Sequence, residues 1–266
     1  MRQENCCLRI RSKAKRVDQG GTEGLLYVAA RRNGHRRTDL MDGIATGESR
    51  LRVERHCWAF FHSVGGDLRY ISHRDMMRMF RRALVRAELP VRFSEGFNPH
   101  PRIMIPLPRP VGVASDSEAV VVEFDAAIDP VETLHRLDEF TPAGIHMKGA
   151  RRVASVKECV PRSARYRLEM EGQDREQLSG RVREVLSRDV VTVERRSRKD
   201  GSLRSVDIRE YIMDMRILEC AVEFTLRITG RGTARPAEIA GILGLEADTA
   251  NHRIRRVEVQ WHQKRP

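Results

Sequence analysis

Apolar and polar residues follow a regular pattern from Cys57 onward, and this pattern predicts an ordered succession of strands and helices. Strands are expected where β-branched and aromatic residues cluster, and helices where apolar residues recur every three or four positions. The elements expected in the first half are, in chain order, a strand at 57–64, a helix at 73–87, strands at 91–93, 102–107 and 118–124, a helix at 129–140 and a strand at 145–153. The order β-α-β-β-α-β is that of the ferredoxin-like fold.

The second half of the chain repeats this rhythm. The elements expected there are a strand at 165–171, a helix at 174–187, strands at 190–194, 206–216 and 219–229, a helix at 235–244 and a strand at 252–261, with the basic segment 195–204 at a hairpin tip. The halves share no visible sequence identity, so the repeat is inferred from element order alone. We therefore expect an α+β protein with two tandem ferredoxin-like units, residues 57–160 and residues 161–266.

Residues 1–56 lack such periodicity. Only the run Gly24–Ala30 (GLLYVAA) has the composition of an ordered element. The segment holds 13 Lys and Arg against 7 Asp and Glu, which supplies half of the net charge of +12. This composition is typical of a flexible basic arm. The positive balance of the whole chain favours a polyanionic partner such as RNA, DNA or an anionic surface.

Several classes of protein are disfavoured by what the sequence lacks. No stretch approaches the ~18–20 apolar residues of a membrane-spanning helix, and the N-terminal residues lack the hydrophobic core of a signal peptide, so a cytoplasmic protein without a membrane partner is expected. The five cysteines are scattered, with no C-x-x-C pair, which disfavours disulfides, zinc ribbons and iron–sulfur clusters. Walker A, G-x-G-x-x-G, H-E-x-x-H and G-x-S-x-G motifs are missing too. We expect no cofactor and no metal, and a binding protein rather than an enzyme.

The helix expected at 73–87 is the first candidate for RNA binding. Arg69 precedes it, and Arg74, Arg78 and Arg82 lie on its polar face together with further arginines. A helix N-terminus favours an anion such as phosphate, and the guanidinium fork suits phosphate geometry. The alternative is that Ser72 only caps the helix and that the arginine face is solvated surface.

The loop at 94–102 is the second candidate. Its Phe97, Asn98, His100 and Arg102 supply a stacking ring and hydrogen-bonding groups between stiff prolines, a set that suits an unpaired RNA base and its phosphate. The alternative is a rigid turn between strands. His73 and His100 together also suggest a general acid and base for metal-independent RNA cleavage.

Basic residues of the second half complete the expected RNA surface. They are Arg235, at the start of a helix, Arg255 in the last strand, and the arginines of the 195–209 hairpin segment. The same side chains would also keep edge strands soluble.

The run from Leu68 closely resembles the radical-SAM-linked protein family, a bacterial domain family of unassigned function. The residues that carry the resemblance are Ser72-His73-x-Asp75, Arg78, Arg82-Ala83, Leu89-Pro90, Ser94-x-Gly96-Phe97-Asn98-Pro99-His100-Pro101, and Pro106-Leu107-Pro108 followed by Val111-Gly112 and Ser115. Residues 206–209 and Arg235-Pro236 are similar to the second half of that family. The resemblance covers about residues 57–260 and leaves out residues 1–56.

This resemblance implies an accessory role. Members of the family are often fused to, or encoded with, a cobalamin-binding radical SAM protein, and this chain lacks the C-x-x-x-C-x-x-C cluster motif of such an enzyme. The tandem plan is also similar in architecture to the CRISPR repeat-processing endoribonucleases. Three functions follow as hypotheses: an RNA-binding protein that presents tRNA or rRNA to a modification or processing enzyme, an endoribonuclease that uses His73 and His100, and a protein-interaction adaptor for a radical SAM enzyme.

Overall fold

The computed structural model describes residues 26–27, 56–170, 175–197, 200–246 and 250–262. Within these ranges the elements are β1 (Leu26–Tyr27), β2 (His56–Val64), α1 (His73–Arg86), β3 (Ile103–Met104), β4 (Ala114–Phe124), α2 (Pro130–Phe140), β5 (Ile145–Val153), β6 (Pro161–Glu169), α3 (Arg175–Ser187), β7 (Thr192–Arg196), β8 (Leu203–Asp207), β9 (Ile212–Ile217), β10 (Ala221–Arg227), α4 (Pro236–Ile242) and β11 (Ile254–Trp261). The fold is α+β, as expected.

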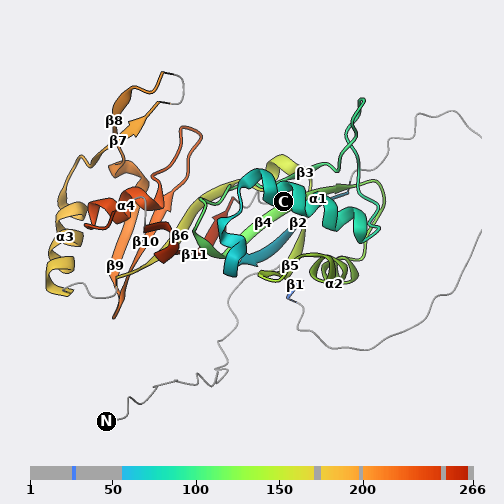
Figure 1. The fold of residues 1–266 in the computed structure, drawn as a ribbon, viewed down its shortest axis with the longest axis horizontal. Coiled ribbons are helices and arrows are strands. Elements are labelled where there is room, and N and C mark those ends of the chain that lie inside the picture. The colour runs from blue at the N-terminus through green and yellow to red at the C-terminus, as the bar shows by residue number, and fades with distance from the viewer. Residues whose placement is uncertain (1–25, 28–55, 171–174, 198–199, 247–249, 263–266) are drawn as a thin grey trace, which may run out of the picture.

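One large, mostly antiparallel sheet runs through the molecule in the strand order β1-β5-β2-β4-β11-β6-β10-β9, with β3 paired to β4. Figure 1 shows α1 and α2 beside β2, β4 and β5, and α3 and α4 beside β6, β9 and β10. The hairpin of β7 and β8 forms a separate small sheet. Strand β1 lies inside the run expected to be ordered and pairs with Gly149 and Ala150 of β5. The rest of the expected basic arm lies outside the described residues, apart from His56 at the start of β2.

Both helices of the first half begin where their capping residues place them. The Ser72 hydroxyl accepts a hydrogen bond from the backbone N–H of Asp75 at the start of α1, as expected. Asp129 caps α2 by accepting from the N–H groups of Val131 and Glu132. The apolar face of α1 then buries Phe80 and its neighbours against the sheet, and its arginines remain on the outside.

The helices cover one face of the sheet. In the first half Phe80 of α1 packs with Phe60 of β2, and in the second half α3 and α4 pack on β6 and β10 around Phe224. A smaller cluster on the opposite face includes Ala59, Phe61 and Trp261. None of the helices in the described part of the chain is long and apolar enough to cross a membrane.

The strands expected at 118–124 and 165–171 begin earlier, at Ala114 and Pro161, and three other expected strands are shortened or divided. Residues 91–93 form only isolated bridges, and 102–107 contracts to Ile103–Met104, because this proline-rich segment offers few backbone donors to the sheet. The strand expected at 206–216 is two strands separated by a 3₁₀ turn at Arg209–Tyr211. Asp207 causes this break, since its carboxylate accepts from the N–H groups of Arg209 and Val191.

The halves of the sheet meet at a seam where β11 lies parallel to β4. Only two residue pairs are in register there, Arg255 with Ala114 and Arg256 with Ser115. On its other side β11 pairs antiparallel with β6. The last strand of the chain therefore joins the two halves.

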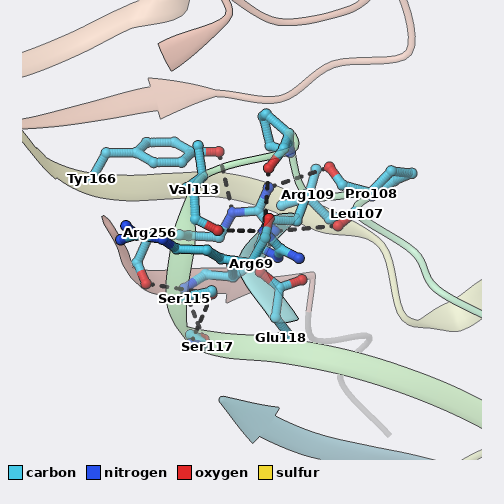
Figure 2. Close-up of polar contacts among 12 residues, drawn as sticks. Arg69, Leu107, Pro108, Arg109, Val113, Ser115, Ser117, Glu118, Tyr166 and Arg256 are labelled. Carbon is cyan, nitrogen blue, oxygen red and sulfur yellow. Dashed lines mark hydrogen bonds and ion pairs between the residues drawn. The ribbon is translucent and has the colours of Figure 1, made fainter. Parts of the chain in front are cut away.

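Arg256 forms a buried ion pair with Glu118 of β4 behind this seam (Figure 2). The two groups lie 2.7 Å apart, with only 1% and 4% of their side chains exposed. Arg256 also donates to the Tyr166 hydroxyl at 3.2 Å and to the carbonyls of Leu107 and Pro108. Burial lowers the pKa of Arg256, but Glu118 and Tyr166 outweigh it, so its pKa is raised. The buried guanidinium thus has a hydrogen-bond partner at each of its three nitrogens, as a buried charge requires.

Residues 107–113, here called the seam loop, supply those carbonyls and are themselves fixed by Arg109. Its guanidinium donates to the carbonyls of Leu68 at 3.1 Å and Arg69 at 2.7 Å, and also to that of Val113 (Figure 2 shows the contacts to Arg69 and Val113). One side chain therefore ties the turn before α1 to the loop before β4.

Gly112 lets the seam loop approach the second half closely. Its φ of +91° lies in the region that favours glycine, and a Cβ there would lie 3.1 Å from the Cβ of Asn251. The Asn251 amide donates to the Val111 carbonyl at 3.0 Å. The Val111-Gly112 motif is therefore explained by packing between the halves.

We predict that Arg256→Met lowers the free energy of unfolding by about 3–5 kcal/mol, because it leaves the Glu118 carboxylate buried and unpaired. Denaturant titration measures this loss. The double variant Arg256→Met/Glu118→Leu should recover most of it, since both charges are then gone.

Arg255→Met is the matched control, one residue away on the same strand. Arg255 pairs with Asp116 at 2.8 Å, but the two side chains are 48% and 40% exposed. Its loss should cost no more than about 1 kcal/mol. An equal loss of unfolding free energy in both variants would show that burial of the Arg256 pair does not determine its contribution to stability.

Candidate functional site

A small cavity lies beneath the start of α1. It measures about 20 Å³, roughly the size needed for one water molecule, and is lined by His62, Ser72, His73, Arg109 and Glu118 together with apolar side chains. His73 is exposed on its outer side. The cavity brings the expected Ser72-His73 motif next to the buried polar groups of the seam.

His62 is the most perturbed group of this cavity. It lies at an inward position of β2, 1% exposed, with its ring centroid 4.9 Å from that of Phe80. Burial is the main cause that lowers the pKa of His62 from 6.5 to about 4; a hydrogen bond with the backbone of Phe60 opposes it, and the positive charges of Arg109 and Lys148 add to it. Its Nδ1 atom has no hydrogen-bond partner among the described residues. His62 is therefore neutral at pH 7 and is not poised as a proton carrier there.

The loop at 94–102 projects from the body of the molecule (teal in Figure 1). His100 turns back onto the base of the loop, where its Nδ1 lies 3.0 Å from the Ser94 Oγ and 3.3 Å from the Asn98 carbonyl. Phe97 is fully exposed at 106%. Arg102 leaves the loop to pair with Glu123 at 3.2 Å. The loop thus presents Phe97 and Asn98 to solvent on a hydrogen-bonded base.

A hollow of about 450 Å³ lies at the foot of this loop. His100 and Arg102 line it, and Arg81 of α1 joins them. Arg81 makes no ion pair within the described residues, but Glu95 and Glu123 also line the hollow, so its lining carries as many acids as arginines.

A groove of about 510 Å³, here called the α1 groove, runs between α1 and the end of α2. Arg78, Arg82 and Arg86 line it in one row at four-residue spacing, which places successive Cα atoms about 6 Å apart. Phe140, at the end of α2, lies on its wall. Asp75 pairs with Arg78 at 2.8 Å, whereas Arg82 and Arg86 make no ion pair among the described residues. Glu139 of α2 also lines the groove, so its lining carries three arginines against two acids and is positive by one charge.

The other arginines expected to contact RNA already bind groups of the protein itself. Arg69 lies over the Tyr70 ring and donates to the His252 carbonyl at 3.2 Å. Arg235 pairs with Glu238 at the start of α4, at 3.7 Å. Arg255 pairs with Asp116, as described above. Of the expected arginines of the first half, Arg74 and Arg82 are exposed without an ion pair in the described structure.

The expected acid–base pair is not brought together. His73 lines the cavity under α1, whereas His100 lines the hollow at the foot of the loop, and no hydrogen bond joins them among the described residues. Within the same residues, no three His, Cys, Asp or Glu side chains group in a way that could hold a metal ion.

The arginines of the β7–β8 hairpin also serve the fold. Arg195 donates twice to Glu238 at 2.8 Å, which anchors the hairpin to α4. Arg209 donates to the carbonyls of Leu186 and Ile212. Among the described residues of this segment, Arg196 and Arg204 are exposed and remain candidates for RNA contacts, whereas Arg198 lies outside the described residues.

Some residues of these hollows were not among the expected site residues. Phe140 is read from the sequence only as the end of a helix, and Arg86 only as part of an arginine face. His62 had a usable signal, because it is a polar residue at an inward position of an otherwise apolar strand.

We predict that stability falls as His62 becomes protonated. Because the folded pKa is about 4 and the unfolded pKa about 6.5, the unfolded state binds more protons between these values. The free energy of unfolding should be constant above pH 7 and about 2 kcal/mol lower at pH 5.0, measured by urea titration. His62→Gln should remove this dependence; an unchanged slope in that variant would assign it to another group.

The family model described as "Uncharacterized protein conserved in bacteria (DUF2344)" matches residues 60–236. The match spans β2 to the start of α4 and includes the α1 groove, the loop and the seam loop. No curated protein matches the chain. Since more than half of the sequence is covered, the chain belongs to this uncharacterized family of bacterial proteins.

Proposed function

We propose that the protein binds a single strand of RNA along the α1 groove. The observation that carries this proposal is the row of Arg78, Arg82 and Arg86 in one groove, with Phe140 on its wall. Guanidinium groups at regular spacing suit successive phosphates, and an aromatic ring suits an unstacked base. Arg74 and Arg81 add positive charge to the same helix.

The protruding loop at 94–102 gives independent support to this proposal. Phe97 exposes its whole ring, which leaves both faces of the ring free to stack. The Ser94–His100 contacts hold the loop in shape, so Phe97 is presented on an ordered base. We propose that Phe97 stacks on a base of the same RNA.

We also propose that each half of the sheet is a ferredoxin-like unit. The order β5-β2-β4-β3 in the first half and β11-β6-β10-β9 in the second both place the fourth, first, third and second strand of a βαββαβ unit side by side. The β7–β8 hairpin is then an insertion between α3 and β9.

We propose an accessory role on the strength of the resemblance to the radical-SAM-linked family. With no C-x-x-x-C-x-x-C motif, the chain would present tRNA or rRNA to a separate modification or processing enzyme, with a cytoplasmic radical SAM protein as the candidate partner. Endoribonuclease activity has no geometric support, because His73 and His100 line different hollows. A role as protein adaptor would instead be indicated by capture of the radical SAM protein without nucleic acid.

We predict that Arg82→Gln/Arg86→Gln weakens RNA binding and lowers its salt dependence. Each lost phosphate contact reduces the slope of log K against log salt by about 0.7 for a single strand, so the double variant should lose about 1.4. Fluorescence anisotropy of a labelled single-stranded RNA, measured from low to moderate salt, gives both slopes.

Arg183→Gln/Arg188→Gln on and just after α3 is the matched control. It removes the same charge from an exposed helix on the other half, where Arg188 pairs with Glu184. Its salt slope should equal that of the native protein. If the slope of log K against log salt falls equally in both double variants, binding depends on net charge and the α1 groove is not the site. RNA cleavage in the presence of EDTA would favour the nuclease alternative.

We further predict that Phe97→Ala weakens RNA binding about tenfold or more without changing the salt slope, because it removes a stacked base and no charge. Since Phe97 is fully exposed, the unfolding midpoint should stay the same. Val85→Ala, a change at an exposed apolar residue of α1, is the control. Equal RNA affinity in both variants would remove Phe97 from the binding surface.

A further inference from the structure

A cavity of about 860 Å³, here called the aromatic cavity, lies on the face of the sheet opposite the helices. Its walls come from β2, β4, β5, β6 and β11, so both halves of the sheet contribute to it. None of the expected site residues lines it. Its volume is in the range of natural small-molecule sites.

Two aromatic rings form one wall of this cavity. Phe61 of β2 and Trp261 of β11 lie with ring centroids 6.2 Å apart at 57°. Both pack against the small apolar cluster of this face, which fixes their positions. Trp261 remains partly exposed into the cavity. A fixed indole is a suitable platform for a planar ring.

The cations of the cavity have no acid to neutralise them. Lys148, Arg151 and Arg162 line it and make no ion pair within the described structure. Lys148 donates to the backbone carbonyl of Asp116, and the Arg151 guanidinium lies 5.6 Å from the centroid of the Phe61 ring.

The two acids that line the cavity are already paired with arginines outside it. Asp116 binds Arg255 at 2.8 Å, and Glu258 binds Arg165. The cavity therefore has a net positive lining, although its walls contain both signs of charge. Such a lining selects an anion.

Polar side chains beside the two aromatic rings can hydrogen-bond to the edge of a planar ligand. Gln260 accepts a hydrogen bond from Ser163 at 3.1 Å through its Oε1, which leaves its NH₂ group to donate. The Ser117 hydroxyl accepts from the Val259 N–H and can still donate its own proton. Both residues line the cavity.

We infer that the aromatic cavity binds a nucleotide, with the base stacked on Trp261 and the phosphate held by Lys148, Arg151 and Arg162. A planar ring with hydrogen-bonding edges joined to a phosphate is the chemistry that matches these walls. The nucleotide is either free or part of an RNA strand. This site lies on the opposite face from the α1 groove and does not depend on that proposal.

The test uses the full chain with Trp58→Phe, so that Trp261 is the remaining tryptophan and its fluorescence reports the cavity. The probes are AMP, GMP, CMP and UMP, with adenosine, inorganic phosphate and a short single-stranded oligoribonucleotide in separate titrations. At least one monophosphate should quench Trp261 with a dissociation constant below about 1 mM. Adenosine and phosphate should each bind about tenfold more weakly than the best monophosphate. Quenching by the oligonucleotide, reversed by the monophosphate, identifies a strand as the source, and quenching by the monophosphate alone identifies a free nucleotide.

Two variants locate the site by calorimetry. Trp261→Leu should reduce affinity for the monophosphate about tenfold or more, and Arg162→Gln, at an exposed position that is not expected to affect folding, should reduce it severalfold. Arg183→Gln is the charge-matched control on α3 and should bind as the native protein does. The inference is overturned if neither the monophosphates nor the oligonucleotide bind. It is also overturned if inorganic phosphate binds as tightly as the monophosphate, or if Arg162→Gln binds the monophosphate with the affinity of the native protein. Arg82→Gln/Arg86→Gln should leave the quenching unchanged, so failure of one proposal does not imply failure of the other.

Discussion

The buried ion pair of Arg256 and Glu118 sets the arrangement of the centre of the molecule. A charge removed from water must have its hydrogen bonds supplied by the protein, and here they come from Tyr166 and from the backbone of the seam loop. The backbone carbonyls of the seam loop must therefore lie within hydrogen-bond distance of Arg256, and the hydrogen bonds of Arg109 hold the loop in that position. The proline-rich motif before β4 is explained by this requirement, without a ligand.

The same seam separates the two candidate binding faces. Glu118 points to the helix side and lines the cavity under α1, whereas Ser117, its neighbour on β4, lines the aromatic cavity on the other side. Adjacent residues of a strand face opposite sides of a sheet, so one strand serves both. A substitution that shifts β4 at the seam would therefore alter the geometry of both cavities.

The amphipathic elements could be predicted from the sequence because their signals are local. Ser72 caps α1 and Asp129 caps α2, each within a few residues of the apolar pattern it starts. The last strand was predicted, but its buried Arg256 was not distinguished from its exposed neighbours. Alternation from Ile254 places Arg256 at an inward position, but the strand itself gives no sign of the partner, because Glu118 lies 138 residues away in the sequence.

The candidate sites were harder to predict because they depend on contacts between distant residues. The Asp75–Arg78 pair is visible as a helical spacing, but Arg102 meets Glu123 only through the fold. Expected phosphate contacts were therefore partly neutralised by acids elsewhere in the chain. The aromatic cavity needs Phe61 and Trp261 side by side, which no short-range pattern can indicate.

The place of β11 also bears on how the protein is made. The strand that lies between β4 and β6 in the sheet follows both of them in the sequence, so until it is synthesised β4 and β6 each have an unpaired edge toward the other. Glu118 meanwhile lacks its cation. A nascent chain that ends before Ile254 therefore carries two separate half-sheets with edges open to other chains, and synthesis of β11 closes them.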